Sequence, residues 1–300
     1  MRHAVVIDAA AKVNLFLRVL HRRDDGYREV ETLIQSVSLA DEVRVSIADS
    51  GPSISLAVDG PDLGPPEANL AFRAATRLRE VTGFEAAVDI RLTKRIPAGA
   101  GLGGGSSDAA AVLKCLSALT DFHDRDVLLG IARDLGSDVS FFLGETPIAL
   151  GRGRGEVLTP LAPLPEAHLV LALPPVHVST VDAFEALSPV DGITLRDGPR
   201  ELDFGAGLDW ERVAGLAEND FEAAASEGHP EIRSSLDGLR AEGATVALLS
   251  GSGGASFGLF PDAVDAEDAA SVLTERYRWP FLPVVTLSAV PRLSRVNEGA

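Results

Sequence analysis

The fold is decided by the stretch Lys94-Arg95-Ile96-Pro97-Ala98-Gly99-Ala100-Gly101-Leu102-Gly103-Gly104-Gly105-Ser106-Ser107-Asp108. Glycine removes side chains where a backbone must approach a ligand closely, and so dense a run costs more chain entropy than a simple capping loop requires. We expect Ser106, Ser107 and Asp108 to supply the N-cap of an apolar helix over residues 109–119. A glycine loop that leads into a helix N-terminus presents free N–H groups and the positive end of the helix dipole. The stretch therefore predicts an anion site.

Two well-known phosphate loops can be compared with this stretch. The Walker pattern requires Gly-Lys-Ser/Thr after four spacers, and no lysine follows these glycines. The segment from Gly99 to Gly104 does satisfy the dinucleotide pattern. However, the strand before it alternates instead of being fully apolar, residues 93–97 separate that strand from the loop, and the flanking region does not read as βαβ. A lone match of this kind is weak. A nicotinamide-dependent dehydrogenase is kept only as the alternative from a different class.

Composition excludes several classes of function. The 44 acidic and 27 basic residues leave a formal net charge of −17, which repels phosphate backbones and anionic lipids, so we expect neither a nucleic acid nor a membrane as partner. A small anionic ligand is still compatible with this charge. One cysteine, Cys115, and scattered histidines predict no disulfide framework and no metal-ligand cluster. No apolar run resembles a signal peptide or membrane span, and we expect a cytoplasmic protein.

The pattern of elements favours an α+β fold in two domains. A chain of 300 residues fits one large domain or two moderate ones. Short apolar runs at 4–7 and 13–20 predict two strands, and alternation predicts strands near 43–47, 54–58 and 88–92. Helices are expected over 69–81, 209–226 and 230–242, with strands near 245–249 and 255–260. Prolines cluster from about residue 160, so we place the domains at 1–159 and 160–300.

Lysine is unusually rare, which draws attention to the three that occur. They are Lys12, Lys94 and Lys114. Lys12 stands in an apolar, strand-like run, where a lysine is either a solubility device on an edge strand or an inward functional cation. We favour function. Lys114 lies inside the helix that follows the glycine loop and is expected on its solvated face. From the residues alone, Asp138, after Gly136-Ser137, is better explained as a helix-capping aspartate than as a functional carboxylate.

The segment from Pro97 to Ala109 resembles the phosphate-binding signature of the GHMP small-molecule kinases. Further support comes from Ala11-Lys12-Val13-Asn14-Leu15-Phe16-Leu17, Asp25-Gly26-Tyr27 and Leu135-Gly136-Ser137-Asp138-Val139. Weaker support comes from segments 153–156, 219–222 and 250–255. The resemblance implies an ATP-binding N-terminal domain, a substrate-binding C-terminal domain, and phosphorylation of a small alcohol with ATP and Mg²⁺. Within the superfamily, the chain is most similar to the branch that phosphorylates the 2-hydroxyl of a cytidine diphosphate-linked polyol in non-mevalonate isoprenoid synthesis.

The resemblance also implies roles for individual residues. Lys12 and Asp138 match the catalytic pair, and Lys94 and Asn69 match positions beside the nucleotide. The implied phosphate loop comprises Pro97, Ala98, Gly99, Ala100, Gly101, Leu102, Gly103, Gly104, Gly105, Ser106 and Ser107. The implied substrate contacts are Asn14, Tyr27, Arg28 and Phe184, of which Tyr27 and Phe184 would stack on the cytosine base.

Arg28 departs from the family pattern. The usual sequence is Gly-Tyr-His, whereas this chain has Gly26-Tyr27-Arg28. Histidine can donate to and accept from a base edge, but arginine only donates. A GHMP kinase for another alcohol, such as a mevalonate-type or homoserine-type substrate, therefore stays open as an alternative, and the sequence leaves the oligomeric state open as well.

Overall fold

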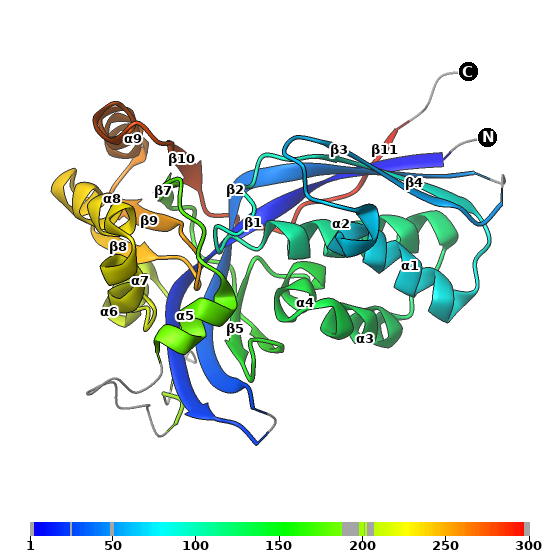
Figure 1. Cartoon of the computed structure of the whole chain (residues 1–300), viewed down its shortest axis with the longest axis horizontal. Coiled ribbons are helices and arrows are strands. Elements are labelled where there is room, and N and C mark those ends of the chain that lie inside the picture. Colours follow the sequence, from blue (N-terminus) through cyan, green and yellow to red (C-terminus); the bar gives the residue numbers. More distant parts are fainter. Residues whose placement is uncertain are drawn as a thin grey trace.

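The computed structural model describes residues 3–24, 26–48, 51–187, 198–200, 202 and 207–296. It contains a seven-stranded sheet and a four-stranded sheet, each with helices, at opposite ends of the molecule (Figure 1). The first sheet has the order β11-β1-β2-β4-β3, and β5 pairs with β2 and β6. Its strands are β1 (His3–Arg22), β2 (Arg28–Ala48), β3 (Ile54–Asp59), β4 (Ala87–Thr93), β5 (Ile148–Arg152), β6 (Val157–Pro160) and β11 (Ser294–Val296).

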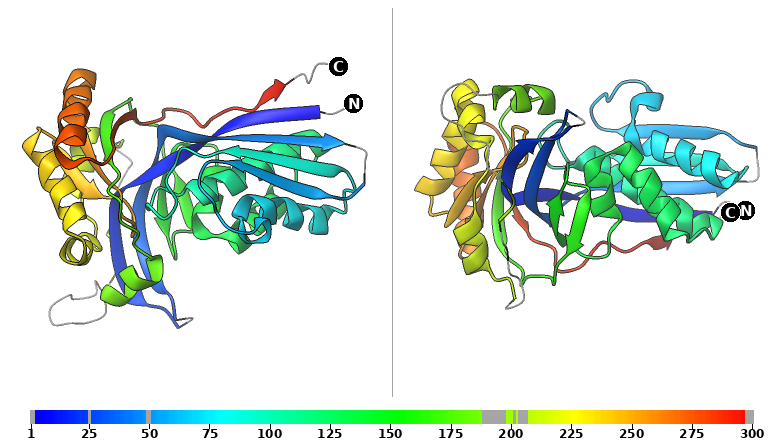
Figure 2. Two further views of the ribbon diagram at one scale, coloured as in Figure 1. Left: turned by 45° about the horizontal axis from the view of Figure 1, so that its top comes forward. Right: turned by 90° about the horizontal axis from the view of Figure 1, so that it is seen from below.

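The hairpin of β1 and β2 is longer than the sequence predicts. Instead of two short strands, residues 3–22 form one strand, because the alanines at 9–11 continue it through a stretch with little strand propensity. These alanines are buried, so packing overrides their propensity. The register shifts between Ala10 and Ala11 and again between Asn14 and Phe16, which bends the strand where Lys12 lies. Both views of Figure 2 show the end of this hairpin lying beside α5 (Thr180–Ala186).

Helices α1 (Leu70–Thr82), α2 (Gly104–Thr120), α3 (Arg125–Leu135) and α4 (Ser137–Leu143) lie on one side of the first sheet (Figure 1). Helix α1 matches its prediction, with Asn69 as its N-cap and Gly83 in the left-handed conformation at its end. The apolar face of α1 packs with Leu113 of α2 and Ile90 of β4 in one core. The 3-10 segment η1 (Pro66–Ala68) directly precedes Asn69 and α1.

Helix α2 begins earlier than predicted. Its N-cap is Gly103, in the left-handed conformation at φ 72°, and no side chain caps it. The predicted capping residues Ser106, Ser107 and Asp108 therefore lie within the helix, and the last two are buried. Glycine adopts positive φ without steric cost, so the loop can turn directly into the helix. The first free N–H groups are thus those of the glycines themselves.

The second sheet has the order β10-β7-β9-β8, with β7 (His168–Ala172), β8 (Val246–Leu249), β9 (Ser256–Phe260) and β10 (Phe281–Val285). Its helices are α5 (Thr180–Ala186), α6 (Trp210–Leu216), α7 (Glu222–Gly228), α8 (Pro230–Ala241) and α9 (Ala263–Tyr277). The predicted helix over 209–226 is wrong as one element. The chain breaks it between α6 and α7, where Asn219 forms a β-bridge with Leu17 of β1.

The chain passes from the first sheet to the second between β6 and β7, close to the proposed boundary at residue 160. Strand β11 then returns to pair with β1, so the end of the 160–300 segment lies in the first sheet. The α+β class is confirmed, since the described strand ladders are antiparallel apart from β3 with β4. Together β3, α1 and β4 do form a βαβ unit, contrary to expectation, but this unit precedes the glycine loop instead of containing it.

Candidate active site

Lys12 and Asp138 lie together at the centre of the molecule. Lys12 projects from the bent part of β1, and Asp138 occupies the second position of α4, whose N-cap is Gly136. Asp138 is therefore not the N-cap residue of α4, so helix capping does not explain its presence. The Lys12 Nζ atom lies 3.9 Å from Asp138 Oδ2, with side-chain exposures of 5% and 34%. The lysine is buried while the carboxylate is reachable from solvent, as a group that accepts a proton from a substrate must be.

A chain of hydrogen bonds fixes the position of Lys12. Its Nζ donates to Asn14 Oδ1 at 2.5 Å, Asn14 Nδ2 donates to Thr32 Oγ1 at 2.8 Å, and Thr32 donates to the Phe16 carbonyl at 2.7 Å. Burial lowers the pKa of Lys12, and the charge of Asp138 raises it in part. A bound anion would favour the charged ammonium in the same way. Asn14 thus holds the lysine, and the second hydrogen of its Nδ2 could serve a ligand.

The glycine loop packs against the second glycine-rich segment, residues 250–255. A Cβ atom on Gly101 would collide with the Ser250 carbonyl oxygen, and one on Gly253 would collide with the Gly101 amide nitrogen. The amide of Ala255 donates to the Ala100 carbonyl at 3.0 Å. The two backbones approach so closely that neither could carry side chains at these points. The contact therefore gives a physical reason for both runs of glycine.

The second glycine-rich segment also lies beside Lys12. A Cβ atom on Gly251 would stand 3.2 Å from Lys12 Nζ. Asn219 fixes this segment by donating from Nδ2 to the carbonyls of Leu249 and Gly251, both at 2.8 Å. On the opposite side, the Lys12 amide donates to the Leu102 carbonyl at 3.0 Å. Lys12 is thus enclosed by β1 and by both glycine-rich segments.

A buried ionic cluster joins the two ends of the glycine loop. Lys94 Nζ contacts Asp41 Oδ2 and lies 2.6 Å from Asp108 Oδ2. Asp41 Oδ1 accepts from the amides of Arg95 at 2.5 Å and Ile96 at 2.8 Å. Burial, together with the nearby negative charge of Asp41, raises the pKa of Asp108 to about 7, although Lys94 acts in the opposite direction. Asp41 could not be identified from the sequence, because it lies in no recognisable motif.

The two residues expected beside the nucleotide have structural partners. The ammonium of Lys94 is held by the two carboxylates just described, and Asn69 Oδ1 caps α1 by accepting from the Ala71 amide at 2.9 Å. Lys94 lies just before the glycine loop, and Asn69 lies at the start of α1, which packs against α2. Their contact with a nucleotide stays a prediction.

Three of the four residues expected to bind substrate meet at one pocket, and the fourth, Asn14, lies beside Lys12 instead. Tyr27, Arg28 and Phe184 line a cavity of about 530 Å³ between the end of the β1–β2 hairpin and α5. Ser137, the neighbour of Asp138, lines it too, which places the pocket next to the Lys12–Asp138 pair. Tyr27 is 56% exposed, as a stacking surface for a ligand should be. Phe184 is held edge-on against Phe221, with ring centroids 4.9 Å apart.

Several pocket residues were not predicted. Arg154 places its guanidinium 4.9 Å from the centre of the Tyr27 ring, and Arg22 lines the same cavity. The segment Gly153-Arg154-Gly155-Glu156 supported the family resemblance, and this was the available signal for Arg154. Within the described residues, the Nη1 atom of Arg28 is buried without a hydrogen-bond partner. A buried donor of this kind is costly unless a ligand satisfies it.

No group of three or more metal-binding side chains occurs in the described part of the chain. Within the same residues, no helix is long and apolar enough to cross a membrane.

Comparison with known proteins agrees with this geometry. The N-terminal domain of GHMP kinases matches residues 69–145, and the C-terminal domain matches residues 206–278. The 4-diphosphocytidyl-2-C-methyl-D-erythritol kinase of Pelotomaculum thermopropionicum is 41% identical over 291 residues, covering 95% of this chain and 98% of that protein. That of Chlorobium phaeobacteroides is 39% identical over 281 residues, covering 92% and 96%.

Solved structures give the same result. A crystal structure of 4-(cytidine 5'-diphospho)-2C-methyl-D-erythritol kinase matches with a TM-score of 0.76 and 40% identity, covering 94% of this chain and 98% of that one. A homoserine kinase from Cytophaga hutchinsonii shares the fold, with a TM-score of 0.71 at 19% identity and coverage of 98% and 97%. The fold and the paired glycine segments define a GHMP kinase. Within that class, the chain belongs to the family of 4-diphosphocytidyl-2-C-methyl-D-erythritol kinases.

Family membership makes the protein an ATP-dependent kinase and excludes the dehydrogenase alternative. The fold agrees, because the glycine loop leads into α2 and then α3, not into a strand parallel to β4.

Proposed function

We propose that the protein transfers the γ-phosphoryl group of ATP to the 2-hydroxyl of 4-diphosphocytidyl-2-C-methyl-D-erythritol. The observation that carries this proposal is the position of the Lys12–Asp138 pair. It lies beside the glycine loop and adjoins, through Ser137, the pocket lined by Tyr27 and Phe184. The relatives named above are kinases for this substrate.

The N-terminus of α2 would bind the phosphates of ATP. Its first amides, at Gly104, Gly105 and Ser106, have no partner within the helix and stand at the positive end of the dipole. A Cβ atom on Gly103 would lie 2.9 Å from the Phe142 ring and 3.1 Å from Lys12 Cγ, so only glycine leaves this approach open. The residues present therefore fit a polyphosphate.

Mg²⁺ would neutralise and orient the phosphates when bound. Magnesium commonly keeps several waters and takes one or two carboxylates together with substrate phosphates. Because the described residues form no cluster of metal ligands, the ion would arrive with ATP instead of occupying a site made by the protein alone.

Asp138 would accept the proton of the attacking hydroxyl, and Lys12 would stabilise the negative charge that develops on that oxygen and on the transferred group. Phosphoryl transfer depends mainly on positioning and charge stabilisation, so rigid placement of the pair matters most. The hydrogen bonds through Asn14 and Thr32 supply that rigidity.

Tyr27 and Phe184 would stack on the cytosine, and Arg28 would read its edge. A guanidinium can donate to the adjacent O2 and N3 acceptors of cytosine, whereas uracil presents an N3–H donor at the same position. The unpartnered Nη1 of Arg28 suits this role. Arg22 and Arg154 add positive charge at the same pocket for the diphosphate.

The test is ADP release from Mg-ATP with 4-diphosphocytidyl-2-C-methyl-D-erythritol, compared with its uridine counterpart, the alcohol without cytidine, and no substrate. We expect release only with the cytidine compound. Equal rates with the uridine compound would refute the role of Arg28 but keep the reaction. Release with mevalonate or homoserine instead would overturn the proposed substrate.

A further inference from the structure

Lys114 is not on a solvated face, contrary to the sequence-based expectation. The residue is half-buried on the side of α2 that faces β1 and α4. Ser107, Ala111 and Lys114 share this face, and the small side chains of the first two leave room for the lysine. In the described part of the chain, no hydrogen bond or ion pair engages its ammonium. The proposed reaction does not use this lysine.

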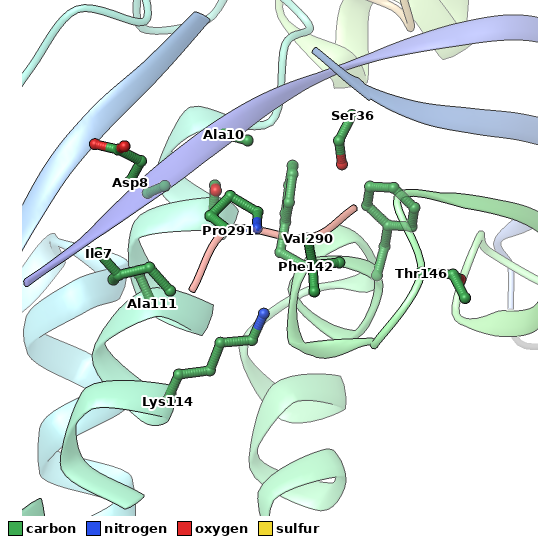
Figure 3. Close-up of a pocket in the computed structure, with 13 residues that line it drawn as sticks. Ile7, Asp8, Ala10, Ser36, Ala111, Lys114, Phe142, Thr146, Val290 and Pro291 are labelled. Carbon is green, nitrogen blue, oxygen red and sulfur yellow. The ribbon is translucent and has the colours of Figure 1, made fainter. Parts of the chain in front are cut away.

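The ammonium points into a narrow cavity of about 20 Å³ that is partly open to solvent, as Figure 3 shows for the labelled side chains. A volume of about 10–15 Å³ on this measure holds one water-sized particle, so the cavity accepts one small species. Its polar lining includes the hydroxyl residues Ser36 and Ser107, whereas the hydroxyl of Thr146, which also lines it, donates to the Ile148 carbonyl at 3.0 Å. Its apolar wall includes Phe142 together with Val290 and Pro291, which come from the segment between β10 and β11.

The nearest acidic groups do not neutralise Lys114. Asp8 lines the cavity, but its carboxylate points away from the ammonium in Figure 3. Glu145 forms an ion pair with Arg125. Burial lowers the pKa of Lys114 to about 8, with Glu145 and Cys115 acting weakly in the opposite direction, so most molecules still carry the charge at pH 7. A half-buried cation without a counter-charge is unfavourable.

We propose that this cavity binds one monatomic anion, chloride under ordinary conditions, held by the Lys114 ammonium and the surrounding hydroxyl groups. The cavity is too small for phosphate or sulfate. A carbamate formed by carbon dioxide on the Lys114 amine is also unfavourable, because it would place a carboxylate in a cavity that no other cation lines. The cavity adjoins the phosphate loop, since Ser107 belongs to both, and Phe142 lines the cavity while it contacts Gly103 of the loop. It does not depend on the proposed substrate.

Bromide diffraction tests the site directly in the unaltered protein. Crystals grown without chloride and soaked in sodium bromide should show an anomalous peak within hydrogen-bonding distance of Lys114 Nζ. A peak elsewhere only, or density in the cavity that is water without anomalous signal, would overturn the proposal. This measurement needs no variant and so does not depend on the folding of one.

Thermal unfolding tests the site in solution. At constant ionic strength, replacing gluconate by chloride should raise the Tm of the wild type by about 2 °C at pH 7. The rise should shrink at pH 9.5, where the amine is largely neutral, and vanish in Lys114→Met. The control Arg91→Met removes an exposed cation on β4 and should keep the full response. An undiminished chloride response in Lys114→Met would refute the site.

Discussion

The ammonium of Lys12 lies 3.9 Å from the carboxylate of Asp138, across the contact between β1 and the first turn of α4. At this separation the two opposite charges attract. The Lys12 ammonium donates a hydrogen bond to Asn14 on one side, so we expect a ligand to approach it on the side that faces Asp138. In the proposed mechanism the two residues have separate tasks, proton acceptance for Asp138 and charge stabilisation for Lys12.

Replacement of Asp138 by Asn should lower kcat by about 10²–10⁴-fold, because the proton acceptor is lost while shape is kept. The KM for ATP should change little, since Asp138 is not part of the glycine loop. Lys12→Met should lower kcat by a similar factor. Steady-state kinetics with both substrates varied measure these effects. As the matched control, Asp134→Asn on neighbouring α3 removes an exposed carboxylate and should be neutral. Near wild-type turnover in both active-site variants would refute the assignment.

Removal of the Tyr27 ring should weaken binding of the cytidine substrate. Stacking of a base on an aromatic side chain contributes about 1–3 kcal/mol, so Tyr27→Ala should raise the substrate KM by about 5–150-fold. The KM for ATP should stay constant, because Tyr27 lines the proposed substrate pocket and not the glycine loop. Tyr27→Phe keeps the ring and is the control for stacking. A substrate KM that is unchanged in Tyr27→Ala would show that the base binds elsewhere.

Two glycines of the loop should respond oppositely to alanine. Gly101 has φ 83° and faces the Ser250 carbonyl, so a methyl group there must displace the second glycine-rich segment beside Lys12. Gly105 is helical, and its nearest outside atom to a new Cβ is Leu70 Cδ1 at 3.7 Å. Gly101→Ala should therefore lower both Tm and kcat/KM for ATP, whereas Gly105→Ala should leave Tm unchanged or higher. Similar losses in both variants would contradict the packing argument.

Local sequence predicted the elements with strong patterns. Helix α1 (Leu70–Thr82) lies within one residue of the predicted range 69–81. The start of α2 was placed late, because side-chain capping by Ser106 to Asp108 is the commoner arrangement and a left-handed Gly103 gives no distinct signal. Lys12, Asp138 and Tyr27 were placed by motif resemblance. Asp41 and the environment of Lys114 were not foreseen, since both depend on which distant strands and helices pack together, and this is a property of the fold.

Asp108→Asn should change how stability depends on pH. The pKa of Asp108 is raised from 3.8 to about 7 in the folded protein. Between these values the unfolded chain has lost a proton that the native state still holds, so wild-type stability falls as pH rises through this window and levels off above it. The slope for one proton is at most about 1.4 kcal/mol per pH unit. The variant has no such group at this position, so its stability relative to wild type should increase from pH 4 to pH 7.

Urea unfolding of both proteins at pH 5, 6, 7 and 8 measures this difference. Lys94 has a raised pKa and stays charged throughout, so it adds no slope in this range. The exposed pair of Asp89 with Arg91 offers a control, because Asp89→Asn should run parallel to wild type over the same pH range. If Asp108→Asn also ran parallel, the ionic cluster would already be fully ionised in the native state below pH 5. The cluster would then hold the two ends of the glycine loop independently of pH near neutrality.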